Sequence, residues 1–476
     1  MHDIVALDAV SLSRAVRQRA LSCVEVMQAY LEHIERVNPP VNAIVGLQDP
    51  ELSLAQARER DEQLDRGEYL GWMHGFPHAV KDLAAAAGLP FTMGSPLFED
   101  QVATEDELFV ARLRAAGAVF VGKTNTPEFG LGSQTYNPVW GTTGNAYDPV
   151  LTAGGSSGGA AAAVALRMVP VADGSDFMGS LRNPAAFNNV FGLRPSAGRV
   201  PEPGFLVSPA VVGPMARTTE DLAALLSVMA GADPGTPLAN SEDPAVFTRS
   251  LERDFRGTRI AWVGDWNGHL ATEPGLLELC ESSFAVFESL GCSVEGALPD
   301  FSPERIWETF LTWRWWGNAA AGHDFHRHEE RRARLKPEAV WEIENGLRLS
   351  GLDVSTAAAA RAELYAAVQR LFERYDFVLA PSAQVFPFDK KVHWPTEIDG
   401  RPMDTYHRWM ETVACWSLTG LPVLGMPVGF GARGLPMGVQ LIGRHQADLA
   451  VLQLGHAYEQ ATHWVDRTPP PSVVGA

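Results

Sequence analysis

The chain has 476 residues, of which 46% are hydrophobic and 20% are charged, a composition typical of a globular protein with a large core. Its 38 basic and 57 acidic residues give a formal net charge of -19, which repels nucleic-acid phosphates and anionic lipid surfaces. We therefore expect neither a nucleic acid nor a membrane among its partners.

The cysteines and the N-terminus indicate a reducing compartment. Four cysteines are widely spaced and form no C-x-x-C pair (Cys23, Cys280, Cys292 and Cys415). The N-terminus has the acidic Asp3 where a signal peptide has basic and then apolar residues. We expect free thiols and a cytoplasmic location, and the sequence allows a homodimer.

The predicted elements alternate between helices and short strands. An amphipathic helix is predicted over 22–37, where Ser22 and Glu25 fit a capping box. Strands are then predicted at 77–81, 118–122, 169–172 and 259–264, and helices at 105–116, 157–166, 219–230 and 273–290. This alternation predicts an α/β fold in a single large domain, with a central twisted mixed sheet flanked by helices.

Composition divides the chain further. The segment 302–396 is rich in Trp, Arg, Glu and His and is predicted to be a helical insertion or cap that contributes to a substrate pocket. Residues 467–476, with three consecutive prolines, are predicted to form a flexible tail. The expected domain is 1–466, with an N-terminal helical region over 1–75 and a catalytic core over 76–200.

Two serines lie in glycine-rich backbone, which indicates acyl-transfer chemistry. Ser156 lies within Gly154–Gly159, and Ser180 follows Gly179. A serine hydroxyl needs a neighbouring base to become a nucleophile, and a glycine-rich turn can direct backbone N–H groups at a developing oxyanion.

The candidate base is Lys81, in the apolar strand 77–81. Strand alternation sends Lys81 and Asp82 to opposite faces, so the carboxylate need not neutralise the amine. Burial among apolar groups lowers the pKa of a lysine and lets it act as a base near neutral pH. The alternative is a surface lysine in an ion pair, which is the commoner case for a lone lysine.

Two short motifs match this sequence in the wrong context. Gly117 to Thr124 fits the phosphate-loop pattern, but its intervening residues are themselves a predicted strand, so we expect Lys123 to be structural. Gly154 to Gly158 fits the nucleophile elbow of α/β-hydrolases, but no apolar strand precedes it.

An aromatic run over 305–316 is predicted to be a helix with one core-packed face. A remaining face, with Trp313 and Trp316, is a candidate lining for an apolar or aromatic substrate pocket. The nearby cluster His323, Asp324, His326 and His328 alternates with arginines, so we expect a solvated surface and no metal site.

These residues resemble the amidase signature family in both motif and order. Seven blocks carry the resemblance: 75–82, 122–129, 154–159, 176–184, 192–196, 419–422 and 434–443. The resemblance implies the amidase signature fold and an amide hydrolase that needs no metal or organic cofactor.

By this resemblance, Ser180 forms the acyl-enzyme, Ser156 is the relay hydroxyl and Lys81 is the ultimate base. The oxyanion hole is expected from the backbone N–H groups of Phe177, Met178 and Gly179 together with that of Ser180. The supporting residues are expected to be Ser157, Asp176 and Arg182, and Gly130 is a further candidate for the pocket. The resemblance also implies a cis peptide bond between Gly155 and Ser156.

One position departs from the family pattern, which has two glycines before the nucleophile. Here the first of them is Met178. If the position requires a positive φ, methionine is strained there; if it does not, the side chain lines the acyl pocket, and we favour the second interpretation.

The sequence thus predicts hydrolysis of a small amide, either a carboxamide or an N-acyl amine with an apolar or aromatic group. The alternative within the resemblance is the amidase-like subunit of a glutamine-dependent tRNA amidotransferase. A non-catalytic binding protein is disfavoured because Lys81, Ser156 and Ser180 are all present.

Overall fold

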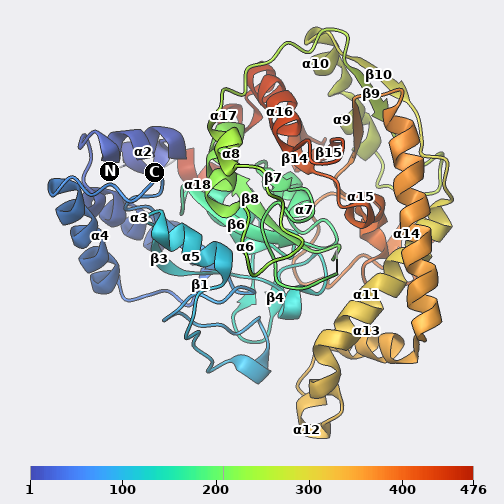
Figure 1. The fold of residues 1–476 in the computed structure, drawn as a ribbon, viewed down its shortest axis with the longest axis horizontal. Helices are drawn as coiled ribbons and strands as arrows, with labels where there is room; N and C mark the ends of the chain where they lie inside the picture. Colours follow the sequence, from blue (N-terminus) through green and yellow to red (C-terminus); the bar gives the residue numbers. More distant parts are fainter. Residues whose placement is uncertain (1, 207, 475–476) are drawn as a thin grey trace.

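The computed structural model describes residues 2–206 and 208–474, which are built around one large mixed sheet (Figure 1). Its eight strands run in the order β10-β9-β11-β15-β14-β7-β8-β6. In that order they are Ser293–Gly296, Arg259–Trp262, Phe377–Pro381, Pro436–Ile442, Val423–Phe430, Phe191–Arg194, Val211–Ala216 and Val171–Asp176. β10, β9 and β11 are parallel, and every later pair in this order is antiparallel. The mixed sheet and the α/β class are as predicted.

The strands nearest the N-terminus form a second sheet, which the sequence did not separate from the first. This sheet has the order β1-β3-β2, with β1 at Ile44–Val45, β2 at Pro77–Lys81 and β3 at Val119–Thr124. Asp173 on β6 links the two sheets, because its carboxylate accepts hydrogen bonds from the backbone N–H of Lys81 (3.1 Å) and from the His78 ring (2.9 Å). This link holds β2 against β6. Two further strand pairs are short hairpins: β4 (Tyr136–Asn137) with β5 (Gly141–Thr142), and β12 (Glu397–Ile398) with β13 (Arg401–Pro402).

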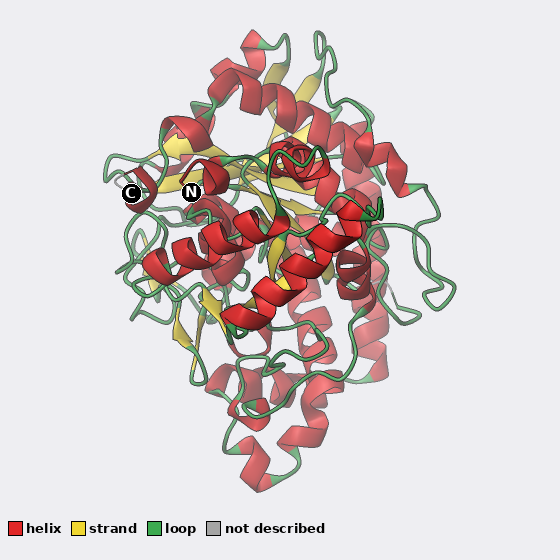
Figure 2. Cartoon of the chain, turned by 90° about the vertical axis from the view of Figure 1, so that its left-hand side faces the viewer, coloured by secondary structure: helices red, strands yellow, loops and turns green. Residues whose placement is uncertain are grey.

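Helices surround the sheets (Figure 2). The N-terminal half contains α1 (His2–Ala6), α2 (Ala9–Arg17), α3 (Cys23–Val37), α4 (Pro50–Asp65), α5 (Leu108–Ala115), α6 (Gly158–Ala165), α7 (Arg182–Phe187) and α8 (Thr219–Met229). The C-terminal half contains α9 (Leu276–Glu281), α10 (Phe284–Ser289), α11 (Pro303–His326), α12 (Glu329–Arg332), α13 (Pro337–Arg348), α14 (Gly351–Phe372), α15 (Ala414–Thr419), α16 (Asp448–Thr462), α17 (Trp464–Arg467) and α18 (Pro471–Val474). Short 3-10 turns occur at Pro96–Phe98, Glu128–Gly130, Pro244–Thr248 and Arg408–Val413.

Local signals predicted several helices well and one poorly. The capping box of Ser22 and Glu25 is present at the start of α3, and β2 has the predicted bounds. The helix predicted over 273–290 is instead two, because the chain breaks between α9 and α10 at Ser282 and Ser283. Serine side chains bond nearby carbonyls, here those of Leu279 and Cys280, and this local bonding competes with a continuous helix.

The segment 302–396 is only partly the predicted helical cap. α11, α13 and α14 are helical as expected, and α12 lies at the far tip of the molecule (Figure 1). The prediction was wrong at β11, which is fully buried between β9 and β15 in the middle of the large sheet. Because a short apolar run is consistent with a strand or a helix, periodicity alone did not separate β11 from the helices before it.

The described part of the predicted flexible tail is packed against the core. The carbonyl of Thr468 accepts hydrogen bonds from the Tyr147 hydroxyl (2.6 Å) and the Asn189 amide (3.4 Å), and Val473 on α18 packs against the hydrophobic core. The prediction of a flexible tail is therefore wrong for 467–474, while residues 475–476 lie outside the described residues.

Within residues 2–206 and 208–474, no helix combines the length and the apolar character needed to cross a membrane.

Gly159, in the first turn of α6, allows this helix to approach the three-stranded sheet closely. A Cβ at Gly159 would lie 2.3 Å from the backbone nitrogen of Asn125 and 2.7 Å from the carbonyl oxygen of Ala43. Neither backbone atom can rotate away, so the residue type here sets the distance between α6 and the sheet.

We therefore expect Gly159→Ala to destabilise the fold by about 1–3 kcal/mol through overpacking. The matched control is Gly317→Ala on α11, where a Cβ meets nothing within 4 Å and should stabilise by about 0.5–1 kcal/mol. Urea unfolding of both variants measures the difference, and a stabilised Gly159→Ala variant would contradict the close approach of α6.

Candidate active site

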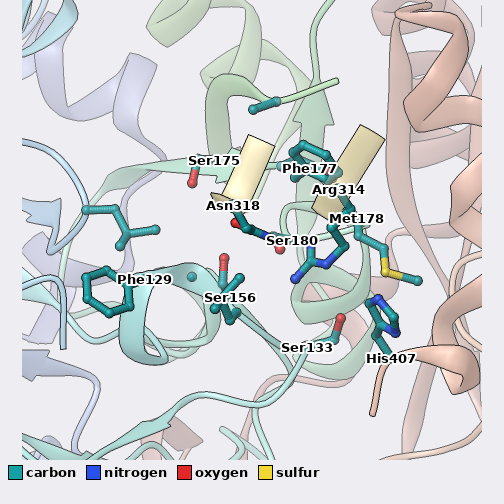
Figure 3. A pocket seen from close by; sticks show the side chains of 16 residues that line it. Phe129, Ser133, Ser156, Ser175, Phe177, Met178, Ser180, Arg314, Asn318 and His407 are labelled. Atoms are coloured by element: carbon teal, nitrogen blue, oxygen red, sulfur yellow. The ribbon is translucent and has the colours of Figure 1, made fainter. Parts of the chain in front are cut away.

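A cavity of about 200 Å³ lies where β6, the loop before α7 and helix α11 meet. Ser156 and Ser180 both line it, so the structure brings the two sequence-predicted serines to one space (Figure 3). Lys81 lies behind Ser156 at the end of β2 and is 1% exposed.

The amine of Lys81 is surrounded by three serine hydroxyls. Its Nζ is 2.8 Å from the Oγ of Ser156, 2.8 Å from the Oγ of Ser157 and 2.9 Å from the Oγ of Ser175. Asp82 faces the other way, as strand alternation predicted, and its carboxylate accepts hydrogen bonds from Thr92 and Trp140. No carboxylate in the described residues forms an ion pair with the amine of Lys81.

Burial dominates the electrostatics of Lys81. Desolvation lowers the pKa of this amine to about 7, although the negative charges of Asp173 and Asp176 act to raise it. The amine is therefore uncharged in a large fraction of molecules near neutral pH, and an uncharged amine can accept a proton.

The three hydroxyls around Lys81 are not equivalent. Ser157 donates its hydroxyl hydrogen toward the carbonyl oxygen of Ser175 (3.3 Å), and its Oγ accepts from the backbone N–H of Ser175 (3.3 Å). The hydroxyls of Ser156 and Ser175 have no hydrogen-bonding partner except Lys81 among the described residues, and both residues line the cavity. Either hydroxyl is therefore free to give its hydrogen to the amine, and the family resemblance favours Ser156. The peptide bond between Gly155 and Ser156 is cis, as the family resemblance implied.

Asp176 organises the turn that carries Ser180. Its carboxylate accepts hydrogen bonds from the backbone N–H groups of Gly179 (2.9 Å) and Leu181 (3.1 Å) and pairs with Arg182 (2.8 Å). Arg194 adds a second buried guanidinium at 3.3 Å. Burial acts to raise the pKa of Asp176, but the two guanidinium groups and these hydrogen bonds hold it well below the usual range.

The turn before Ser180 resolves the question of Met178. Met178 does not have a positive φ, and its side chain lines the cavity, so the favoured interpretation is confirmed. Gly179 is the residue that needs glycine, because its φ is 78° and a Cβ would lie 3.0 Å from Val413.

The predicted oxyanion donors are only partly available. The N–H of Gly179 already donates to Asp176, so this residue is removed from the predicted set. The N–H groups of Phe177, Met178 and Ser180 donate no hydrogen bond to another described residue.

The far end of the cavity contains residues that the sequence analysis missed. Arg314 on α11 lines it and is held by Glu342 on α13 (2.5 Å) and by the Tyr406 hydroxyl (2.7 Å). His407 lines the same end, and burial lowers its pKa well below the usual value, so the ring is neutral there. Asn318, one helical turn after Arg314, also lines the cavity. Arg314 and Asn318 come from the segment predicted to cap the pocket, whereas His407 lies beyond it, and no motif marked any of the three as a pocket residue.

Of the three predicted pocket residues, the structure places one in the cavity and two outside it. Gly130 lines the cavity, whereas Trp313 and Trp316 do not. The two tryptophans contact each other edge to face, and Trp313 packs under the guanidinium of Arg361. They face away because a helix directs only residues about one turn apart to the same side, and Arg314 and Asn318 occupy the cavity side.

Two other predictions concern residues outside the cavity. Lys123 lies within β3 and donates to the carbonyl of Ala84 (2.5 Å), which confirms a structural lysine. In the part of the chain that the structure describes, no group of three or more His, Cys, Asp or Glu residues is arranged to hold a metal ion.

Comparisons with known proteins match nearly the whole chain. The Amidase family model matches residues 25–452. The chain is 34% identical over 477 residues to an acylamidase of Rhodococcus erythropolis, covering 99% of this chain and 98% of that protein. It is 33% identical over 487 residues to a glutamyl-tRNA(Gln) amidotransferase subunit of Methylococcus capsulatus, covering 96% of this chain and 97% of that protein. Among solved structures, a bacterial aryl acylamidase of the amidase signature family superposes with a TM-score of 0.88 at 28% identity, covering 96% of both chains.

We expect Asp176→Asn to destabilise the protein by about 3–5 kcal/mol, because it leaves the buried guanidinium groups of Arg182 and Arg194 without a counter-charge. Asp254→Asn is the control, since its pair with Arg256 is exposed to solvent and should leave the unfolding midpoint nearly unchanged. Denaturant unfolding of both variants tests this expectation, and similar midpoints would show that the buried cluster does not stabilise the fold.

Proposed function

This chain belongs to the amidase family, and from that premise we propose that it hydrolyses small N-acyl amines or carboxamides through an acyl-enzyme on Ser180. The family and the acylamidase relatives make it an amide-hydrolysing enzyme. The observation that carries the proposed mechanism is the contact of the buried Lys81 amine with Ser156 at the edge of the cavity that Ser180 lines.

In the proposed first step, neutral Lys81 takes the proton of Ser156, and Ser156 takes the proton of Ser180. The oxygen of Ser180 forms a bond to the carbonyl carbon of the amide, and the π electrons of the carbonyl move to its oxygen. Ser157 and Ser175 support this step, because they accept hydrogen bonds from Lys81 and leave the lone pair of the neutral amine toward Ser156.

In the second step, the C–N bond breaks and Ser156 gives its proton to the leaving nitrogen, while protonated Lys81 restores the proton of Ser156. Protonation matters because an amide anion is a poor leaving group. Water then attacks the acyl-enzyme, loses its proton through the same relay, and Ser180 leaves with a proton. No metal ion or organic cofactor enters these steps.

The oxyanion is proposed to bind to the backbone N–H groups of Phe177, Met178 and Ser180. The absence of other acceptors for these groups among the described residues supports this assignment. The Asp176 cluster supports it too, because one carboxylate paired with two guanidinium groups leaves net positive charge beneath the turn.

We expect kcat/KM to rise about tenfold per pH unit below pH 7 and to level off above it, because only the uncharged form of Lys81 accepts a proton. A pH profile of the wild type measures this limb. Lys81→Ala should lose on the order of 10²–10⁴-fold at neutral pH.

Ser180→Ala is the matching variant for the nucleophile and should show no turnover and no labelling by a fluorophosphonate. Labelling of the wild type at Ser180, located by peptide mass, is the positive result. Full activity in Lys81→Ala would remove the lysine from the mechanism.

The second candidate is the amidase component of a tRNA amidotransferase, which the 33% identity to such a component over most of the chain favours. The net charge of -19 argues against work on RNA. The two candidates differ in their need for partner subunits.

We expect the purified chain alone to release an amine from simple N-acyl amines at its full rate. Adding a bacterial lysate depleted of this chain, with glutamine and tRNA, should not raise the rate of ammonia release from glutamine. Activity that depends on such additions would favour the amidotransferase function.

A further inference from the structure

We infer that the substrate's leaving amine is its larger, aromatic half and that this half binds in a second cavity beside the catalytic one. The inference rests on the proposed function, because it assigns the two sides of the amide bond to two parts of the same site. It predicts that anilides of short acyl groups are better substrates than aryl carboxamides.

The second cavity adjoins the first and has a volume of about 310 Å³. Leu83, Phe129, Leu131 and Asn318 line both cavities, so the two spaces share a wall. At about 200 Å³ the catalytic cavity alone is smaller than most small-molecule sites, which begin near 300 Å³. With the second cavity included, the available space reaches the usual range.

The wall of the second cavity is apolar and partly aromatic. Asn318 is its only polar side chain among the described residues, and no charged side chain lines it. The rings of Phe129 and Phe325 are nearly parallel, with centroids 6.4 Å apart, and Phe98 packs edge-on against Phe325 at 5.4 Å. Aromatic rings favour such stacked and edge-on neighbours, so an aryl group fits this wall better than a charged alkylamine.

Phe129 reaches this position through an unusual backbone. Its φ is 54°, in the left-handed region where a bulky residue is uncommon, and its N–H donates to the carbonyl of Met93 (2.8 Å). Such conformations persist where the surrounding structure enforces them and are frequent at ligand sites. The strained backbone sets the ring of Phe129 between the two cavities.

The position of Ser156 decides which half of the substrate lies on this side. Ser156 must protonate the leaving nitrogen, so the amine has to lie at the Ser156 end of the catalytic cavity. That end adjoins the second cavity: a Cβ on Gly130 would lie 3.6 Å from the Oγ of Ser156 and 2.8 Å from Leu83. Leu83 lines both cavities, so the amine side leads into the second one.

The acyl half then lies at the opposite end. Figure 3 shows Phe129 and Ser156 toward one side of the catalytic cavity and Met178, Arg314 and His407 toward the other. Met178 fills part of the space there, which suits a short acyl group better than an aryl one.

The test compares an anilide of a two-carbon acid, an aryl carboxamide and a small aliphatic amide. Wild type should cleave the anilide with a kcat/KM at least about tenfold above that of the aryl carboxamide, the size of discrimination that an apolar pocket provides. A preference for the aryl carboxamide would overturn the assignment of the two halves.

Ala321→Trp places a large side chain at the mouth of the second cavity, from an exposed position on α11. We expect it to lower kcat/KM for the anilide at least about tenfold and to leave the small aliphatic amide and fluorophosphonate labelling within about twofold. Ala320→Trp, at the neighbouring exposed position that lines neither cavity, is the matched control and should change none of the three. Equal losses on the anilide and the aliphatic amide in Ala321→Trp would refute a separate site for the amine.

A binding measurement keeps this inference testable without turnover. Calorimetry with aniline, the expected product, should detect binding to the wild type, Ser180→Ala and Ala320→Trp, and weaker binding to Ala321→Trp. Equal binding to all four proteins would exclude the second cavity as the amine site. If the wild type cleaves no amide and is not labelled by fluorophosphonate, the proposed function fails. If only the assignment of the second cavity to the amine is wrong, the wild type is still labelled.

Discussion

The amine of Lys81 is buried among three serine hydroxyls, and the proposed chemistry depends on this amine losing its charge. Burial lowers its pKa to about 7. The nearby carboxylates do not reverse this shift, because they are bonded to other partners. Asp173 accepts from His78 and from a backbone N–H, and Asp176 is matched by two guanidinium groups. The fold thus keeps negative charge close enough to organise the site, but bonded to other partners.

Partly buried polar contacts connect the start of α13 to the turn that contains Phe129. The backbone N–H of Lys336, at the start of α13, donates to Glu128, and its amine donates to the carbonyl of Leu131. Glu128 and Leu131 flank Phe129, so the same contacts fix the ring between the two cavities. Under the proposed function, the part of the molecule that forms the substrate space is therefore held to the part that forms the reacting groups, and a change in α13 should alter substrate choice while the reacting groups stay in place.

Much of the site was predictable because its residues lie in short, locally constrained motifs. Glycine-rich turns identified Ser156 and Ser180, and strand alternation separated Lys81 from Asp82. Arg314 and His407 were missed because they lie far apart in sequence and no motif contains them. The misassigned Trp313 shows the limit directly: a helix can be predicted from its pattern, but which of its faces meets a cavity depends on packing by other segments.

The sequence by itself determined the α/β class and the candidates for nucleophile, relay and base, because these candidates are marked by residue type and by local backbone. Only the tertiary structure decided that the Ser157 hydroxyl is engaged by the carbonyl of Ser175 while the Ser156 hydroxyl contacts Lys81 alone, and that Gly179 gives its N–H to Asp176. It also decided that β11 lies inside the large sheet between β9 and β15, and that a second cavity shares a wall with the cavity that Ser156 lines. These features depend on contacts between distant segments, and the energy of such contacts appears only when the chain is folded.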